Sequence, residues 1–319
     1  MKRIAVWRTH SLLRHSIGLS LLFCISAIAV SCTVANSNNS SQVETTPSTT
    51  PAITQPLRVA LIPAQSSKEQ EKKLQPLIQY LEKILKRPVT FQITKDYDTA
   101  VELLVKEEAD MAYLGALTYI QARNRNPSIE PLVIPISEST GRPWYTSVIV
   151  ANTAKEIKSL KDLKGKRFAF VSPSSTSGFL LPMNALQSQG IDPTRDFTKI
   201  RYPGGHDKVQ QELADNLVDA IATDKAPFLR NQKSGKLAAA KYKVIWESDP
   251  IPATPIVINT KKLSPEIIQQ LRQALIDAPV GIVDVTGAKS AGYTLAKDAD
   301  FEQIRQVYTR LKSVTVPEK

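Results

Sequence analysis

Strand-like and helix-like segments alternate along this chain from residue 57 onwards, and this alternation constrains the fold more than any other feature. Short apolar runs at 57–62, 89–94 and 111–114 have the length and composition of buried strands. Between them, apolar residues of 74–85 recur at the 3.6-residue period of an amphipathic helix, and 99–108 predicts another helix. Strand–helix–strand repetition predicts α/β architecture with a largely parallel sheet.

A second α/β unit begins near Thr146. It is predicted to hold strands at 147–151, 166–171, 218–222 and 243–246, a helical turn at 160–163 and helices at 179–189 and 209–216. The proline-rich stretch 247–255 then leads back to a strand at 256–258 and helices at 265–278 and 301–311. A chain that leaves one lobe and returns makes two hinge crossings, which suits a two-lobed clamshell that closes on a small ligand. We assign 57–145 plus 250–319 to lobe I and 146–249 to lobe II.

The first 31 residues have the features of an export signal. Four Lys and Arg side chains and no acid accompany an apolar run of 15 residues at 16–30, which is short for a membrane span and typical of a signal peptide. The run ends in Ala29-Val30-Ser31-Cys32, which resembles a bacterial lipobox. The sequence therefore predicts a lipoprotein signal peptide at 1–31 and, at 32–56, a lipidated Cys32 followed by a disordered tether. The alternative is an uncleaved membrane anchor.

Charge and cysteine content narrow the classes of function. The net charge is +11, and removing 1–31 takes away four cations and no anion, which leaves +7. The cations are scattered among acids, so we predict no nucleic-acid partner. Cleavage leaves one Cys and, as the only histidine, His206, which argues against zinc sites built from several of these residues. We predict no metal and no cofactor, although carboxylate metal sites remain open.

The sharpest local feature is a hydroxyl-rich turn between a predicted strand and a predicted helix. Ser175, Thr176 and Ser177 precede Gly178, at the point where the helix begins. The first turn of a helix has unpaired N–H groups and the positive end of the helix dipole, so it favours anions. The alternative is an ordinary N-cap by Ser175 or Ser177, with the other hydroxyls solvated.

Two further polar residues fall where ligands bind in open α/β sheets. His206 follows Gly204 and Gly205 at the start of a predicted helix, where it could donate a hydrogen bond to an anion. Asp224 follows the strand at 218–222, at its carboxyl end. A carboxylate beside an oxyanion site can recognise a protonated oxygen or an amine. The alternatives are a capping or surface histidine and an N-cap aspartate.

Aromatic residues of lobe I are the remaining candidates. Tyr113 lies at the end of the strand at 111–114, and the stretch 115–119 could close the other face of the cleft. Trp144 and Tyr145 lie near the first crossing, where an aromatic ring could cover an apolar substituent of the ligand. Packing in the core or the hinge is the alternative for each of them.

Taken together, these motifs resemble the phosphate/phosphite/phosphonate-binding periplasmic proteins of ABC importers. The resemblance runs from about residue 57 to near the C-terminus and rests on ordered motifs: Ser175-Thr176-Ser177-Gly178, Gly205-His206, Val218-Asp219-Ala220 with Asp224, the segments 245–252 and 160–166, and Asp110-Met111-Ala112-Tyr113-Leu114-Gly115. It implies that the Ser-Thr-Ser turn holds the phosphoryl oxygens, with His206 as a further donor and Asp224 in the family's acidic or amide position. Leu114 and Ala116 depart from residues that some members have there.

The predicted function is therefore a non-enzymatic solute receptor. It is expected outside the cytoplasm, anchored to a membrane through Cys32, monomeric, and docking on an ABC permease after closing on a phosphorus oxyanion. The predicted ligand-binding residues are Ser175, Thr176, Ser177, His206, Asp224, Tyr113 and Tyr145. The alternatives are a sulfonate receptor or a sensory protein of the same fold. A Ser/His/Asp hydrolase is less well supported, because no Gly-x-Ser-x-Gly elbow surrounds Ser175.

Overall fold

The computed structural model describes residues 55–312, apart from 65, 283 and 285–287. All of these residues belong to one compact unit that spans 53–319. The predicted signal peptide, Cys32 and nearly all of the predicted tether lie outside the described residues. Within the described part of the chain, no helix combines the length and the apolar character that crossing a membrane requires.

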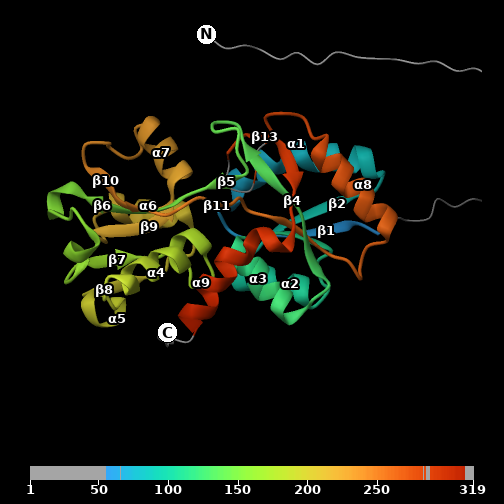
Figure 1. Ribbon diagram of the computed structural model, residues 1–319. Coiled ribbons are helices and arrows are strands. Elements are labelled where there is room, and N and C mark those ends of the chain that lie inside the picture. The colour runs from blue at the N-terminus through green and yellow to red at the C-terminus, as the bar shows by residue number, and fades with distance from the viewer. Residues whose placement is uncertain (1–54, 65, 283, 285–287, 313–319) are drawn as a thin grey trace, which may run out of the picture. The chain divides into compact units, whose positions relative to one another are not determined.

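A six-stranded sheet is built from the two ends of the described chain. Its strand order is β13-β4-β12-β3-β1-β2, and its strands are β1 (Leu57–Leu61), β2 (Val89–Ile93), β3 (Met111–Tyr113), β4 (Ile129–Ser137), β12 (Ile256–Asn259) and β13 (Ser290–Leu295). Helices α1 (Ser67–Leu85) and α8 (Pro265–Ile276) pack together on one face. Helices α2 (Tyr97–Val105) and α3 (Ala116–Arg125) pack together on the other (Figure 1).

A five-stranded sheet is built from the middle of the chain. Its order is β10-β6-β9-β7-β8, with β6 (Ser147–Asn152), β7 (Arg167–Ala169), β8 (Lys199–Arg201), β9 (Ala220–Asp224) and β10 (Tyr242–Glu247). The helices of this part are α4 (Leu181–Ser188), α5 (Pro193–Asp196), α6 (His206–Ala214) and α7 (Lys225–Lys233), with α6 and α7 on the opposite face from α4 and α5 (Figure 1). Short helical turns occur at η1 (Thr153–Lys155), η2 (Leu160–Leu163) and η4 (Asp298–Phe301). The middle strands of both sheets are fully buried, as in β3 and in Val148, Ile149 and Val150 of β6.

Two connections join the sheets, and they run side by side. Strand β5 (Trp144–Tyr145) of the outgoing connection pairs antiparallel with β11 (Ile251–Pro252) of the returning one, with Ile251 opposite Tyr145. Helix α9 (Glu302–Lys312) adds a further link, because it packs on α3 and also on α4. Its Arg310 donates a hydrogen bond of 2.8 Å to Asn184 Oδ1 of α4.

The predicted α/β architecture is confirmed, whereas the predicted largely parallel sheet is wrong. Strands β1, β2 and β3 are parallel, as are β7, β8 and β9. Strand β12 is antiparallel to both of its neighbours, and so is β6. These two strands are the first to follow each crossing, so they begin at the side of the sheet at which β3 and β9 end; β13 is likewise antiparallel to β4.

Several elements were not predicted from the sequence: helices α3, α5 and α7, strands β4, β8 and β13, and the short strands β5 and β11. Strand β4 contains Pro131 and Pro135, which are unfavourable inside a sheet because proline has no N–H to donate. Both prolines are nevertheless paired, and the register of each neighbouring strand shifts beside them. These local irregularities allow a proline-containing strand in the interior of the sheet.

Candidate functional site

The Ser-Thr-Ser turn forms the start of a helix and one wall of a buried cavity. After β7 the chain turns into η3 (Thr176–Leu180), a π-helical turn that continues as α4. Ser175 is the N-cap, and its Oγ accepts a hydrogen bond of 3.0 Å from the N–H of Gly178. Ser175, Thr176 and Ser177 are each only 2% exposed, and all three line the cavity. Ser175 therefore both caps the helix and lines the cavity.

The inner cavity, as we call it, is lined by residues that follow strands of both sheets and by residues of the crossings. Its walls are Ile62, Ala64, Tyr97, Gly115, Tyr145, Ser175, Thr176, Ser177, His206, Asp224 and Thr254. Six of the seven predicted ligand-binding residues are in this set. The available space is about 20 Å³, which is close to the room that one or two water molecules need.

The seventh predicted residue, Tyr113, lies elsewhere. Its side chain is fully buried, and its hydroxyl is 3.2 Å from the hydroxyl of Tyr293 in β13. Side chains along a strand alternate between the two faces of a sheet, so the end of a strand does not by itself bring a side chain to the cleft. Gly115, two residues further on and the N-cap of α3, lines the inner cavity instead.

Two tyrosine hydroxyls complete the hydroxyl wall. Tyr97 interacts with Ser175 and Tyr145 with Ser177, and all four residues line the inner cavity. Burial raises the pKa of both phenols, so both stay neutral and able to donate a proton. Tyr97 is not among the ligand-binding residues predicted from the sequence. It lies at the start of α2, four residues after the carboxyl end of β2. In open α/β sheets, ligands bind beyond the carboxyl ends of the strands, so this position is a suitable one for a ligand contact.

Elements of the two sheets touch directly across the cavity. The N–H of Leu117, in the first turn of α3, donates a hydrogen bond of 2.9 Å to Thr176 Oγ1. Nearby, Ser174 Oγ donates to Asp98 Oδ1 of α2 at 2.5 Å. The amino ends of α3 and of η3 therefore meet at this place, and their partial positive charges are directed to the same region.

His206 is held as a neutral hydrogen-bond donor. Its Nδ1 accepts a hydrogen bond of 3.2 Å from the N–H of Asp224 and lies 3.0 Å from Thr223 Oγ1. Because Nδ1 accepts, the proton of the neutral ring resides on Nε2. Burial lowers the pKa of His206 to about 4, so the ring carries no charge at neutral pH.

A chain of amide and hydroxyl groups supports this tautomer from behind. Asn231 Nδ2 donates to Gln210 Oε1 at 2.8 Å, and Gln210 Nε2 donates to Thr223 Oγ1 at 3.5 Å. Because Thr223 Oγ1 accepts the hydrogen bond from Gln210, its own proton is available to donate to His206 Nδ1. These contacts fix the orientation of the ring before any ligand arrives.

Asp224 ends β9 and caps α7 while it lines the inner cavity. Its Oδ1 accepts a hydrogen bond of 2.8 Å from the N–H of Ala226. Burial raises the pKa of Asp224 to about 7, against smaller opposing effects of the Ala226 hydrogen bond and the Arg230 charge. The carboxyl group therefore exchanges a proton near neutral pH. Again the cap and the cavity role coincide in one residue.

Comparison with known proteins shows to which protein family the chain belongs. The family described as "ABC transporter, phosphonate, periplasmic substrate-binding protein" matches residues 59–301. The chain belongs to this phosphonate-binding family. The resemblance predicted from the motifs is thereby confirmed.

Individual relatives of the chain cover most of its length. The Phosphate-import protein PhnD of Mycolicibacterium smegmatis is 29% identical over 304 residues, which are 89% of this chain and 92% of that protein. The Phosphonates-binding periplasmic protein of Escherichia coli is 30% identical over 63% of this chain and 60% of its own length. The structure of PhnD1 from Prochlorococcus marinus with methylphosphonate has a TM-score of 0.72 and 24% identity, covering 81% of this chain and 99% of that one.

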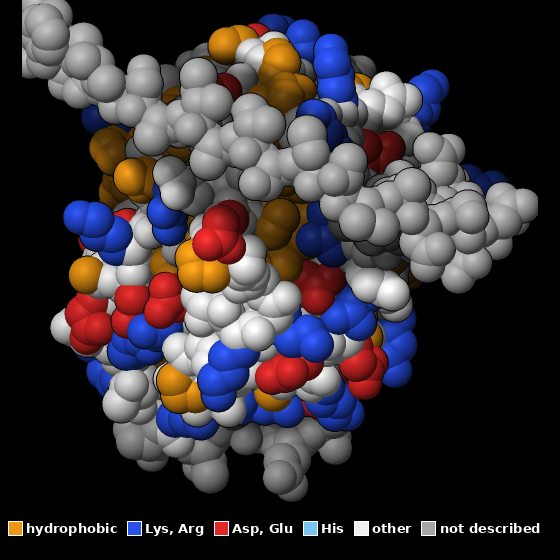
Figure 2. All heavy atoms as spheres, turned by 90° about the vertical axis from the view of Figure 1, so that its right-hand side faces the viewer, with side chains coloured by type: hydrophobic (Ala, Val, Ile, Leu, Met, Phe, Trp, Pro, Cys, Tyr) orange, Lys and Arg blue, Asp and Glu red, His pale blue; other side chains and the backbone are white. Residues whose placement is uncertain are grey.

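Membership of the phosphonate-binding family confirms the two-lobed periplasmic-binding-protein fold and a role in ABC transport outside the cytoplasm. Proteins of this family are in general binding proteins and not enzymes. Within the described residues, no group of three or more His, Cys, Asp or Glu side chains is arranged to hold a metal ion. On the face shown in Figure 2, blue and red side chains are interspersed.

Proposed function

We propose that the protein captures phosphate-, phosphite- or phosphonate-type oxyanions at the inner cavity, which separation of the lobes would widen to admit the anion, and delivers them to an ABC permease. The observation that carries the proposal is the convergence of neutral donors on one small space. The hydroxyls of the Ser-Thr-Ser turn, two neutral tyrosines and His206 with Nε2–H all border it. Neutral donors and helix ends can hold a buried oxyanion without a lysine or arginine beside it.

Asp224 supports a phosphorus oxyanion over a sulfonate. A carboxylate repels a bare anion, but it accepts a hydrogen bond from a protonated ligand oxygen. Phosphate monoesters have a second pKa of about 6, so part of the ligand carries such a proton near neutral pH. Sulfonates stay fully ionised and have no proton to share. When Asp224 is ionised, above its pKa of about 7, the site therefore disfavours the sulfonate alternative, because a sulfonate leaves the carboxylate unpaired.

The hydrolase alternative does not fit the contacts of His206. A catalytic triad needs the histidine Nδ1 to donate to a carboxylate, while Nε2 takes the proton of the nucleophile. Here Nδ1 accepts from the N–H of Asp224, and Asp224 Oδ1 accepts from Ala226. The residues Ser175, His206 and Asp224 lie around one cavity, but they are not connected as a triad.

Tethering and closure belong to the same proposal. The lipobox-like sequence before Cys32 and the polar stretch after it support a lipid anchor with a flexible tether, which mass spectrometry of the Cys32 peptide would test. The paired crossings β5 and β11 support a hinge between lobe I (57–145 plus 250–319) and lobe II (146–249). The receptor is proposed to act as a monomer.

A thermal-shift and calorimetry series tests the oxyanion assignment. At a hundredfold excess over the dissociation constant, a ligand adds about 2.7 kcal/mol to the free energy of unfolding. For a domain of this size we expect melting to shift by about 5–10 °C with phosphate, phosphite or methylphosphonate, and much less with sulfate or taurine. Absence of a shift with every phosphorus oxyanion contradicts the proposal.

The Ser177→Ala variant links the binding to the hydroxyl wall. A hydrogen bond to a charged group contributes about 1.5–3 kcal/mol, so we expect the Kd to rise about 10- to 150-fold. Melting of the ligand-free protein should hardly change, because Ser177 is not the N-cap of the helix. Ser188→Ala is the control, since Ser188 is exposed at the far end of α4. Equal affinity of both variants would remove Ser177 from the site.

A further inference from the structure

The π-helical register of η3 leaves one carbonyl group of the hydroxyl turn without its usual donor. The N–H of Leu181 donates to the carbonyl oxygen of Thr176, five residues back. In the same register the carbonyl oxygen of Ser177 would accept from residue 182, which is a proline and has no N–H. In an ordinary α-helix its donor would be Leu181, whose N–H is already engaged. The Ser177 carbonyl group therefore needs a donor from outside the helix.

Ser147 supplies this donor. It is the first residue of β6, directly after the first crossing, and it is fully buried. Its Oγ donates a hydrogen bond of 2.6 Å to the carbonyl oxygen of Ser177. A buried carbonyl group without a donor is costly, so this bond stabilises the π-helical turn. In that turn the residues Thr176 and Ser177 line the inner cavity.

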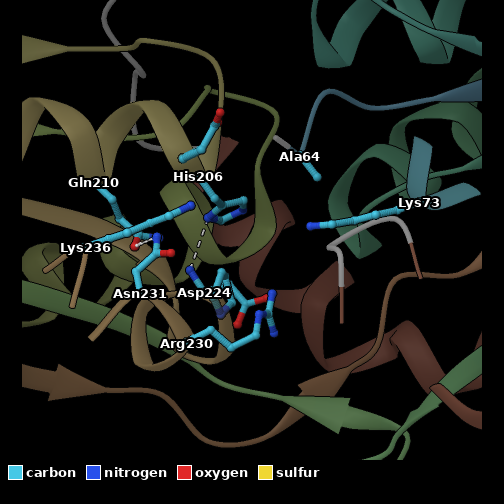
Figure 3. A pocket seen from close by; sticks show the side chains of 10 residues that line it. Ala64, Lys73, His206, Gln210, Asp224, Arg230, Asn231 and Lys236 are labelled. Carbon is cyan, nitrogen blue, oxygen red and sulfur yellow. Dashed lines mark hydrogen bonds between the residues drawn. The ribbon is translucent and has the colours of Figure 1, made fainter. Parts of the chain in front are cut away.

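Ser147 is itself held in place by the returning crossing. Its N–H donates a hydrogen bond of 2.9 Å to Ser248 Oγ, and its carbonyl oxygen accepts one of 2.9 Å from the N–H of Ser248. Within the sheet Ser147 pairs with Asp224 of β9, whose N–H donates to His206 Nδ1 (Figure 3). Ser147 therefore contacts the hydroxyl turn through its side chain and the strand that carries Asp224 through its backbone.

We propose that Ser147 is a positioning residue of the binding site, which holds the π-helical turn in the register that directs Thr176 and Ser177 to the anion. Ser147 is not among the residues that line the inner cavity, so it acts through Ser177. The inference rests on the proposed function, because it concerns how tightly the inner cavity holds an oxyanion. Without the Ser147 hydroxyl group, the turn relaxes toward the α-helical register, in which the N–H of Leu181 donates to Ser177. This change rotates residues 176–180 relative to the cavity, so affinity falls while the fold is retained.

Calorimetry of Ser147→Ala with phosphate, phosphite and methylphosphonate tests the inference on the purified protein. For each anion that the parent binds, we expect the Kd to rise about tenfold, the effect of one misplaced hydrogen bond. Ser147→Cys keeps a weak donor, so its Kd should lie between those of the parent and Ser147→Ala, and it takes the place of Ser147→Ala if that variant does not fold. Ser290→Ala is the matched control, because Ser290 of β13 is also buried and its Oγ donates to the carbonyl oxygen of Gly292 at 2.5 Å. It should lower the melting temperature and leave the Kd unchanged.

A restored backbone donor gives a test that a merely structural role of Ser147 does not satisfy. Pro182→Ala supplies an N–H five residues after Ser177, where the π-helical register needs it. In Ser147→Ala/Pro182→Ala we expect the Kd to return to within about threefold of the parent value, whereas Pro182→Ala alone should change it less than about twofold. The inference is overturned if Ser147→Ala binds like the parent, if Ser290→Ala weakens binding equally, or if Pro182→Ala does not restore the affinity. If the parent protein binds none of the three anions, the proposed function fails as well.

Discussion

At the scale of single residues, two neighbouring groups of the site have pKa values shifted in opposite directions. Burial raises that of Asp224 to about 7 and lowers that of His206 to about 4. In the unfolded chain these groups titrate near 3.9 and 6.5. Both shifts keep the neutral form, because the site is removed from water. Between about pH 4 and 7, both Asp224 and His206 are therefore mainly neutral in the ligand-free protein. In the unfolded chain at least one of the two side chains is ionised throughout this pH range.

The two shifts have opposite effects on stability as the pH changes. Between about pH 4 and 7 the folded protein retains a proton on Asp224 that the unfolded chain has released. The free energy of unfolding therefore falls as the pH rises through this window. Between about pH 6.5 and 4 the unfolded chain binds a proton on His206 that the folded protein lacks, so the free energy of unfolding falls as the pH decreases. In the parent protein these contributions partly cancel.

The Asp224→Asn variant should reveal how His206 alone changes the free energy of unfolding with pH. Asparagine keeps the N-cap for α7 but cannot ionise. At pH 8 and without ligand we expect the variant to be more stable by a few kcal/mol, at about 1.4 kcal/mol for each pH unit between the two pKa values of Asp224. Its stability should then decrease from pH 6.5 to 4, as urea unfolding at a series of pH values would measure. A variant that is no more stable than the parent at pH 8 contradicts the raised pKa, and the exposed Asp215→Asn is the control.

At the scale of elements, each of the two sheets contains an arginine–aspartate pair that joins neighbouring parallel strands. Arg58 of β1 pairs with Asp110, just before β3, at 2.8 Å. Arg167 of β7 pairs with Asp219, just before β9, at 2.7 Å. Each aspartate also accepts from the backbone N–H of its arginine. These pairs join the beginnings of neighbouring parallel strands, at the opposite ends of the strands from the site. Asp110 and Asp219, the aspartates of two motifs that contributed to the family resemblance, therefore stabilise the sheets and do not line the inner cavity.

The hydroxyl turn depends on the absence of a side chain at Gly178. A methyl group there would lie 2.3 Å from Val171 Cγ2 and 2.9 Å from Ser175 Oγ. Val171 is fully buried and cannot move aside easily. We expect Gly178→Ala to destabilise the empty protein by about 3 kcal/mol, at the upper end of the usual cost of overpacking. Differential scanning calorimetry would measure this, and Ser188→Ala on the same helix should melt like the parent. An unchanged melting temperature in Gly178→Ala would show that the turn can shift freely.

At the scale of the whole molecule, contacts between the sheets hold the cavity closed. Gly115 lies at one of these contacts, since a methyl group there would be 3.3 Å from Thr176 Oγ1 in the other part of the molecule. Gly115→Ala should therefore oppose closure without disturbing either sheet. We expect the Kd for methylphosphonate to rise about three- to tenfold, equal to about 0.7–1.4 kcal/mol. Melting of the ligand-free protein should stay within about a degree, because the proposed hinge would let the lobes separate and relieve the contact.

Small-angle scattering provides a second measurement for this variant. The parent protein should become more compact when methylphosphonate is added, and Gly115→Ala should need more ligand for the same change. Gly178→Ala serves as the contrast, because its clash lies within one lobe and lowers the stability of the empty protein. If Gly115→Ala instead lowers stability and leaves affinity unchanged, the contact between Gly115 and Thr176 is not part of a closing motion.

The sequence by itself determined the alternation of strands and helices, the family, and most of the residues around the cavity. Apolar periodicity is a local property, and hydroxyl or glycine residues at strand ends reflect local backbone requirements, so both are readable without a fold. The tertiary structure decided what depends on distant partners. It turned Tyr113 toward Tyr293, brought Tyr97 to Ser175 and Ser147 to Ser177, and reversed β6 and β12. Positions that meet only after the chain has crossed twice between two sheets leave no pattern along the sequence.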